Sequence, residues 1–135
     1  PKVSEKKKKQ IAEQKESSTD VALDKWFDDG MGLPRICENC CSALKHYSDK
    51  DFRGSQHHIL EKSLYPSVKT NPLNRLILGK WCCHQTWHQS WEKAIQMRIF
   101  YKALIAIKKL YPLLTRDEKR KIPEVLMQEL NPELI

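Results

Sequence analysis

The chain lacks any long hydrophobic run. None of its apolar stretches approaches the ~20 residues that a membrane-spanning helix needs, so we expect no transmembrane segment. Lysines near the N-terminus are not followed by an apolar segment, so the pattern does not resemble a secretory signal. No internal repeat is visible. These absences lead us to expect an intracellular, cytoplasmic protein that has no membrane partner.

The chain has an odd number of cysteines. There are five, including the adjacent pairs Cys40–Cys41 and Cys82–Cys83, and an odd number argues against a closed disulfide framework. A reduced setting with bound metal accounts for them better. Cys37 and Cys40 have the Cys-x-x-Cys spacing at which a tight turn brings two thiolates onto one tetrahedral metal.

Acidic residues are outnumbered by basic ones, 17 against 24, which gives a formal net charge of +7. This balance favours an anionic partner: nucleic acid is the first candidate, and an anionic membrane surface is a second, weaker one because no apolar run is long enough to span a bilayer. The 135 residues are enough for one domain with a modest core.

Three regions follow from composition and periodicity. Residues 1–18 predict a flexible basic tail, because they contain almost nothing apolar; it serves either as a solubilising end or as a DNA-tethering arm. Residues 19–111 predict the folded domain, and residues 112–135 a C-terminal helical extension, with Thr115 as a helix cap and Pro123 in the first turn of a last helix that ends at Leu130.

Within the folded region the sequence predicts two strands and two main helices. Thr19 or Asp20 can cap a short helix that ends at Gly30. Residues 55–60 and 74–81 predict strands, and residues 82–111 predict one long helix because no Pro or Gly interrupts them. That helix is apolar on most of its circumference between residues 99 and 107, so other helices or another chain must cover it.

Four of the five histidines lie between residues 57 and 88. His84 and His88 are four residues apart, so they share one face of a helix and can bind one ion. A strand that ends at His57–His58 can supply a third nitrogen. Adjacent side chains on a strand point to opposite faces, so we expect these two histidines to have different roles.

Taken in order, these groups resemble the HNH endonucleases. The matching elements are Cys37-x-x-Cys40, Gln56-His57-His58-Ile59, Asn74-Arg75-Leu76-Ile77-Leu78 and Cys83-His84-x-x-x-His88. The resemblance covers residues 37–88. It implies an α+β fold with a ββα-metal core, in which two strands and a helix hold one divalent ion, preceded by a zinc-knuckle-like part.

The resemblance also implies residue roles. His58 takes the place of the general base that activates water, and Asn74 that of the residue that orients this base and its loop. His57, His84 and His88 take the places of the metal ligands, as in the histidine-rich, colicin-like branch of the family. Three imidazoles suit zinc, nickel, cobalt or manganese as readily as magnesium.

A second, structural zinc is implied by the same family pattern. Cys37, Cys40 and Cys83 match it, but Lys80 stands where the fourth cysteine belongs, so Cys82 or Cys41 must complete the site. The family's Gly-Gly after the first strand is replaced by residues 63–66.

The predicted function is therefore metal-dependent hydrolysis of DNA phosphodiesters. The basic residues that flank the site in sequence are the phosphate-binding candidates: Arg53, Lys62, Lys69 and Arg75. We expect Trp81, Trp87 and Trp91 to pack in the core. Two alternatives remain: a non-catalytic, zinc-stabilised nucleic-acid-binding module, and a helical interaction protein in which the apolar helix over residues 99–107 pairs with another chain. The same helix is the candidate surface for a homodimer.

Overall fold

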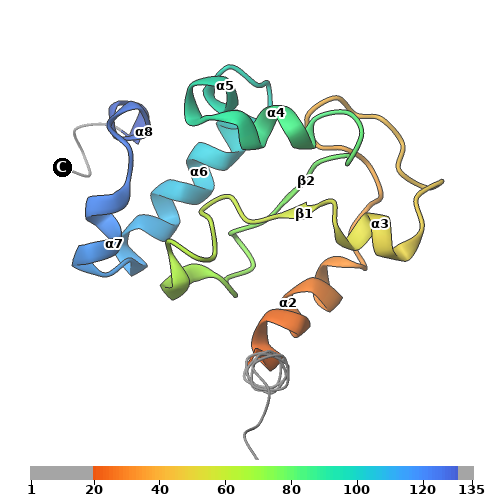
Figure 1. The fold of residues 1–135 in the computed structure, drawn as a ribbon, viewed down its shortest axis with the longest axis horizontal. Coiled ribbons are helices and arrows are strands. Elements are labelled where there is room, and N and C mark those ends of the chain that lie inside the picture. The colour runs from red at the N-terminus through yellow and green to blue at the C-terminus, as the bar shows by residue number, and fades with distance from the viewer. Residues whose placement is uncertain (1–19, 131–135) are drawn as a thin grey trace, which may run out of the picture.

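The computed structural model describes residues 20–130. The predicted basic tail and residues 131–135 lie outside this range. The described residues form an α+β domain in which a two-stranded sheet is surrounded by helices (Figure 1). The predicted fold class is thus confirmed at this level. None of the described helices is long and apolar enough to span a bilayer.

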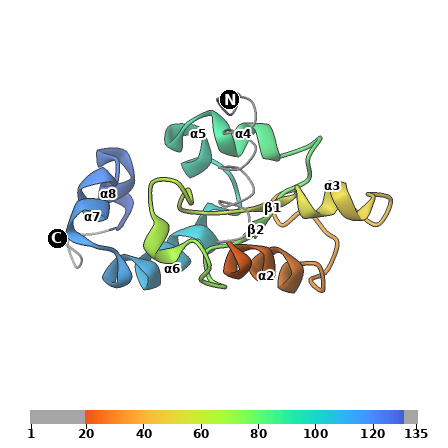
Figure 2. The same ribbon diagram turned by 60° about the horizontal axis from the view of Figure 1, so that its bottom comes forward.

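The helices lie on both sides of the sheet. Figure 2 shows α4 and α5 on one side of the strands and α2 on the other, with α7 and α8 together at one end of the molecule. In chain order the elements are α2 (Val21–Gly30), α3 (Asp49–Arg53), β1 (Gln56–His57), the 3₁₀ turn η1 (Pro66–Val68), β2 (Leu76–Ile77), α4 (His84–Gln89), α5 (Trp91–Ile95), α6 (Phe100–Leu110), the 3₁₀ turn η2 (Tyr111–Leu113), α7 (Arg116–Lys121) and α8 (Glu124–Leu130).

The sheet is antiparallel and shorter than predicted. His57 pairs with Leu76, and each strand has two residues rather than six to eight. Beyond this pair, the buried side chain of Asn74 takes the place of backbone hydrogen bonds between the two strands. Its Oδ1 accepts from the Leu60 N–H at 2.7 Å, and its Nδ2 donates to the Leu60 carbonyl at 3.0 Å. The strands were therefore predicted in the right places but with the wrong lengths, because a side chain continues the pairing.

Helix α2 lies where it was predicted and ends at Gly30, but Asp20 at its N-cap makes no side-chain capping hydrogen bond, and Thr19 lies outside the described residues. Leu23 and Trp26 are buried, and Trp26 Nε1 donates to the Asn71 carbonyl at 3.0 Å. Gln56 of β1 donates from Nε2 to the Phe27 carbonyl at 2.8 Å. A Cβ atom at Gly30 would lie 1.7 Å from Gln56 Oε1, so only glycine allows this close approach.

The single long helix predicted over residues 82–111 is wrong: the segment forms three helices. Ser90 has an extended backbone and caps α5, since its side chain accepts from the Lys93 N–H at 3.2 Å. A second break precedes α6, where Asn39 Oδ1 accepts from the Ile99 N–H and Arg98 binds the Glu38 and Asn39 carbonyls. A serine cap and tertiary contacts thus divide a segment that contains no helix-breaking residue.

The C-terminal elements cover one side of α6. Ala103, Ile107 and Leu110 are buried, and α6 packs against α8, whose Leu126 and Leu130 are fully buried. Thr115 caps α7 as predicted, in a capping box with Glu118. The last helix begins at Glu124, directly after Pro123, and continues to Leu130, the last described residue.

Candidate metal centre

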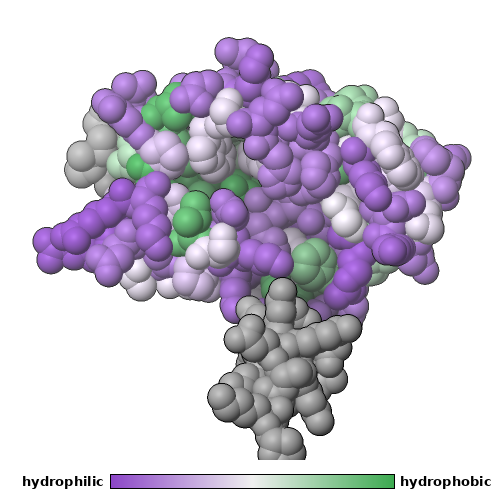
Figure 3. All heavy atoms as spheres, in the orientation of Figure 1, coloured by the Kyte–Doolittle hydropathy of each residue, from purple (hydrophilic) through white to green (hydrophobic). Residues whose placement is uncertain are grey.

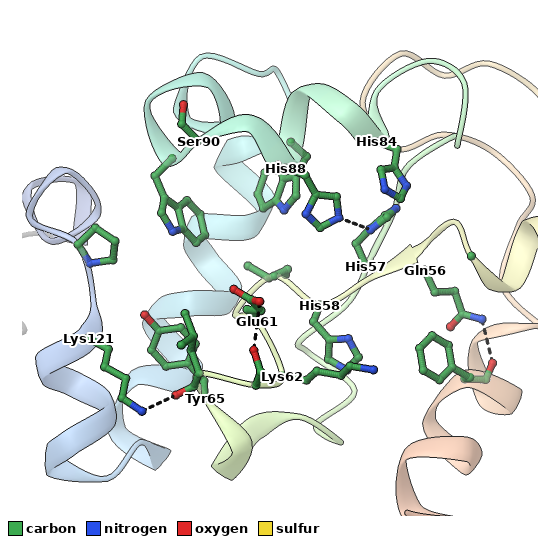
Figure 4. A pocket seen from close by; sticks show the side chains of 18 of the residues that line it. Gln56, His57, His58, Glu61, Lys62, Tyr65, His84, His88, Ser90 and Lys121 are labelled. Carbon is green, nitrogen blue, oxygen red and sulfur yellow. Dashed lines mark hydrogen bonds between the residues drawn. The ribbon is translucent and has the colours of Figure 1, made fainter. Parts of the chain in front are cut away.

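Three imidazoles meet between β1 and the first turns of α4. His57 from β1 and His84 and His88 from α4 present ligand nitrogens that all lie within 4.8 Å of one another. His88 Nε2 is 3.1 Å from His57 Nδ1 (Figure 4). Nitrogens bound to one ion at ~2.0–2.1 Å in a tetrahedron would be about 3.4 Å apart, so this spacing fits shared coordination.

Buried nitrogens without partners mark this three-histidine group. His57 Nε2 and His84 Nδ1 are both buried and have no hydrogen-bond partner. An unsatisfied buried polar atom is costly, and a bound cation would satisfy His84 Nδ1, whereas His57 can give the ion only one of its two ring nitrogens. Burial, with the neighbouring His84 and His88, lowers the pKa of His57 to about 3. Burial also lowers the pKa of His84. These imidazoles are therefore neutral near pH 7, which is the form that binds metals.

A second group contains four sulfurs. Cys37 and Cys40 approach Cys82 and Cys83, with all four Sγ atoms within 4.8 Å of one another. Cys40 Sγ and Cys82 Sγ are 3.5 Å apart. Sulfurs bound to zinc at ~2.3 Å in a tetrahedron would be about 3.8 Å apart, so the four-cysteine group can hold one zinc ion. Of the two residues proposed as the fourth member, Cys82 is the one in place.

Cys41 lies outside the four-cysteine group. It has a φ of 65° and an exposed side chain, and Arg98 Nη2 lies 3.4 Å from its sulfur. The left-handed backbone at this position turns the chain after Cys40, so that consecutive cysteines do not point to the same place.

Polar neighbours surround the four sulfurs. Asn39 Nδ2 donates to Cys83 Sγ at 3.2 Å, and Ser42 Oγ is 3.0 Å from Cys40 Sγ. The hydrogen bond from Ser42 lowers the pKa of Cys40 to about 6, whereas burial raises the pKa of Cys82. Donors of this kind stabilise thiolates, which are the ligands that zinc requires.

His58 is placed differently from His57, as the alternation of side chains along a strand predicts. Its ring stacks on Trp26 of α2, with centroids 4.0 Å apart, and its Nε2 lies 2.8 Å from the Lys69 carbonyl. A carbonyl oxygen only accepts, so Nε2 carries the proton and Nδ1 has the free lone pair. Burial, together with the charges of Lys62 and Arg75, lowers the pKa of His58. A neutral imidazole with a free Nδ1 can accept a proton.

Asn74 acts on the backbone near His58. Besides its two bonds to Leu60, it donates to the Val68 carbonyl at 3.3 Å, next to the Lys69 carbonyl that binds His58. Asn74 thus fixes the loop that orients His58, and its side chain does not bind the His58 ring directly.

One cavity of about 670 Å³ is lined by His57, His58, His84 and His88. Figure 4 shows His57, His84 and His88 at one end of the cavity, with Tyr65 and Lys121 at the other. In Figure 3 an apolar floor is visible in a hollow on this face, surrounded by hydrophilic side chains. No protein-family model, curated protein or solved structure matches the chain. The interpretation of the cavity therefore depends on its own chemistry.

The four predicted phosphate-binding residues differ in position and in partners. Arg53 and Lys62 line the cavity, but Arg53 also pairs with Asp28 at 2.7 Å. Lys69 pairs with Asp20 at 3.1 Å. Arg75 lies over the Trp26 ring, 4.0 Å from its centroid, and faces a different cavity. Over residues 20–130, Lys62 and Arg75 are the two of the four that make no ion pair, and of these two only Lys62 lines the cavity of the histidines.

The predicted core packing holds for Trp87, which is buried, and in part for Trp91. Trp81 is 67% exposed, so the prediction is wrong for this residue. Trp81 lies in the turn that follows Gly79, where its neighbours Cys82 and Cys83 point into the sulfur group and leave the indole outside.

Several residues of the site could not be found from the sequence. Trp26, which stacks on His58, and the Lys69 carbonyl come from segments that approach His58 only in the folded chain. Asn39 was detectable in principle, since it lies inside the Cys-x-x-Cys turn. Tyr65 and Lys121 carry no recognisable pattern.

Proposed function

We propose that the protein is a metal-dependent endonuclease of the HNH type that hydrolyses DNA phosphodiester bonds. The observation that carries the proposal is the convergence of His57, His84 and His88 in the cavity that His58 also lines. Phosphodiester hydrolysis needs a water activated by a base and a cation that bears the developing negative charge.

The residues present fit a divalent ion. Three imidazoles, two of them with a buried nitrogen that has no hydrogen-bond partner, form a donor set suited to zinc, nickel, cobalt or manganese. When bound, the ion would supply Lewis-acid stabilisation of charge on the phosphate and on the leaving 3′ oxygen.

The proposed roles of the side chains follow from their geometry. His58 accepts the proton of the attacking water at Nδ1, because the Lys69 carbonyl holds the other ring nitrogen in its protonated form. Asn74 keeps the Lys69 segment in place through the Val68 carbonyl. Lys62 and Arg53 line the cavity and flank His57 and His58 in the sequence. They are the cations proposed to contact the phosphate of the substrate.

The test is a nicking assay on supercoiled plasmid and on single-stranded circular DNA. Magnesium, manganese, nickel or zinc is supplied to the full chain, against a chelator control. We expect metal-dependent cutting that falls by 10²-fold or more in His58→Ala, the range for loss of general-base catalysis. His46→Ala is the matched control, because His46 is an exposed histidine outside both ligand groups.

A second readout separates catalysis from folding. His58→Ala should keep its bound metal and its melting temperature within a few degrees of the parent chain. Cutting that survives in His58→Ala, or the lack of cutting with every metal, would contradict the proposal.

The four-cysteine group favours one alternative, a zinc-stabilised nucleic-acid-binding module without catalysis. Such a module requires the four-cysteine group for its stability, but it does not require His58 in the cavity. DNA binding without cutting, unaffected by His58→Ala, would support this alternative.

A further inference from the structure

The cavity extends well beyond the three-histidine group. Its volume of about 670 Å³ falls within the ~300–1,000 Å³ typical of small-molecule sites. An ion, a water and one phosphate group would fill only part of it. Figure 4 shows the remainder opening toward Tyr65 and Lys121, away from His84.

Aromatic side chains line this remaining part. Trp91, at the start of α5, is half-buried, and Tyr65 is 2% exposed; both line the cavity. Trp87 meets Trp91 edge to face, with ring centroids 5.7 Å apart, so the Trp91 ring is held by a buried neighbour. A fixed aromatic ring at a cavity wall is a platform on which a nucleobase can stack.

Two lysines accompany the aromatic wall. Lys62 and Lys121 both line the cavity, and in the described part of the chain neither makes an ion pair. Lys121 belongs to α7, and its Nζ lies 3.5 Å from the Leu64 carbonyl, beside Tyr65. Unpaired ammonium groups at the edge of an apolar wall are suited to the phosphates on either side of a stacked base.

The connection of α7 to the cavity wall is specific. Glu118 is buried and accepts from the Ser67 N–H at 2.9 Å, which ties α7 to the segment that follows Tyr65. Lys121 and Tyr65 are therefore held next to each other, although they are far apart in the sequence.

We propose that this end of the cavity binds one unpaired nucleotide next to the scissile phosphate, with its base on Trp91 and its phosphate near Lys121 and Lys62. The proposal rests on the proposed endonuclease function and specifies its substrate class: single-stranded or locally unpaired nucleic acid. An intact duplex keeps its bases stacked inside and presents only its backbone and groove edges, so it has no group to place against a buried aromatic wall.

Binding of oligonucleotides tests the proposal without cleavage. Fluorescence anisotropy of a labelled oligodeoxythymidylate, and of a duplex of the same length, is measured with the full chain without added divalent metal, and a gel confirms that the oligonucleotides remain uncut. We expect tighter binding of the single strand. Trp91→Ala should weaken single-strand binding on the order of tenfold or more, the range for loss of one base-stacking ring.

Matched controls distinguish this surface from others. Trp81→Ala removes an exposed indole that does not line the cavity, and Lys93→Ala removes an exposed lysine of α5 that does not line it either; both should bind as the parent does. Lys121→Ala should weaken single-strand binding and reduce its salt dependence. If Trp91→Ala fails to fold, Trp91→Phe should bind nearly normally and Lys121→Ala carries the test.

The outcomes also separate the two proposals. Equal binding of duplex and single strand, unaffected by Trp91→Ala and Lys121→Ala, would overturn the nucleotide site and leave the endonuclease proposal standing. Single-strand preference that depends on Trp91 and Lys121, without metal-dependent cutting, would support the nucleotide site and count against catalysis. No binding of either nucleic acid would overturn both.

Discussion

At the scale of single residues, Gly79 shows how little space surrounds the four-cysteine group. Its carbonyl accepts from the N–H groups of Cys82, Cys83 and His84, so this one oxygen organises the turn that carries ligands of both groups. A Cβ atom at Gly79 would lie 2.4 Å from Cys82 Sγ and 3.2 Å from Leu44 Cδ2. No side chain fits here without displacing the sulfur.

Gly79→Ala should therefore destabilise the protein by about 1–3 kcal/mol, as overpacking of a tight site does, and should weaken zinc retention. Gly54→Ala is the control, because its Cβ would meet only the Asp51 carbonyl at 3.5 Å and the Lys50 carbonyl at 3.7 Å. Denaturant unfolding of both variants, with zinc analysis, checks the prediction. Equal stability of the two variants would contradict it.

His57→Ala should remove one metal ion and leave the other. The parent chain is expected to bind one ion at each of the two ligand groups, and the variant only the ion of the four-cysteine group. Elemental analysis after dialysis measures the stoichiometry, with His46→Ala as the control. Loss of both ions from His57→Ala, or of neither, would show that the two groups are not separate sites.

Residue identity was the part of the site best predicted from the sequence. The histidine spacing and the resemblance to the HNH pattern indicated three histidine ligands and three of the four cysteines, with Cys82 or Cys41 as the fourth, and the structure brings each group together with Cys82 in place. Spacing works here because a helical turn and a tight turn impose fixed geometry over four residues. The partners of His58 were not predictable, since Trp26 and the Lys69 carbonyl reach it through tertiary packing.

At the scale of elements, α7 depends on one buried carboxylate. Glu118 closes the capping box with Thr115 and also accepts from the Ser67 N–H, so it satisfies backbone donors from two segments. Burial alone would raise the pKa of Glu118, but hydrogen bonds from Ser67 and Thr115 outweigh burial and lower the pKa to about 2.

Glu118→Gln should destabilise the fold by about 1.5–3 kcal/mol, the range for hydrogen bonds to a charged group, because the amide turns an NH₂ toward a backbone donor. Asp117→Asn, at a neighbouring exposed position, is the control. Thermal unfolding at neutral pH compares the two variants.

The same carboxylate predicts a pH dependence. Its pKa is lower in the folded chain than its ordinary value of 4.5, so the unfolded chain binds more protons between these values. The stabilisation from Glu118 is complete above about pH 4.5 and is lost as the pH falls toward 2. Glu118→Gln should lack this part of the stability profile, and an unchanged acid profile in the variant would contradict the assignment.

Element boundaries were predicted less well than element positions. The two strands and the helices α2, α7 and α8 lie where periodicity and capping residues placed them. The prediction of one helix over residues 82–111 was wrong for two reasons. The Ser90 side chain accepts from the Lys93 N–H and starts a new helix, and Asn39 and Arg98 fix the turn before α6. Local patterns do not contain such contacts between distant segments.

At the scale of the whole molecule, the two ligand groups join segments that are distant in the chain. The sulfur group connects the Cys37–Cys40 turn to the Cys82–Cys83 turn, and the histidine group connects β1 to α4. A ligand that binds only the folded state stabilises it by about 2.7 kcal/mol when present at a hundred times its dissociation constant. Metal should therefore contribute a large share of the stability of this small domain.

Removal of metal by a strong chelator should lower the melting temperature by roughly 10 °C, from the relation between free energy and melting temperature for domains of this size. Re-addition of zinc should restore it, whereas magnesium should restore little, because thiolates do not bind magnesium well. Differential scanning calorimetry checks both steps. A melting temperature that the chelator leaves unchanged would contradict metal binding at the four-cysteine group.

The adjacency of Cys83 and His84 has a further consequence. These consecutive residues belong to different ligand groups, and both donate their backbone N–H to the Gly79 carbonyl, so neither group can rearrange without moving the other. Any change that occupancy of one group makes in the affinity of the other is equal in both directions by thermodynamic reciprocity. A zinc ion on the four sulfurs would therefore hold in place the turn from which α4 starts, and with it His84 of the histidine group.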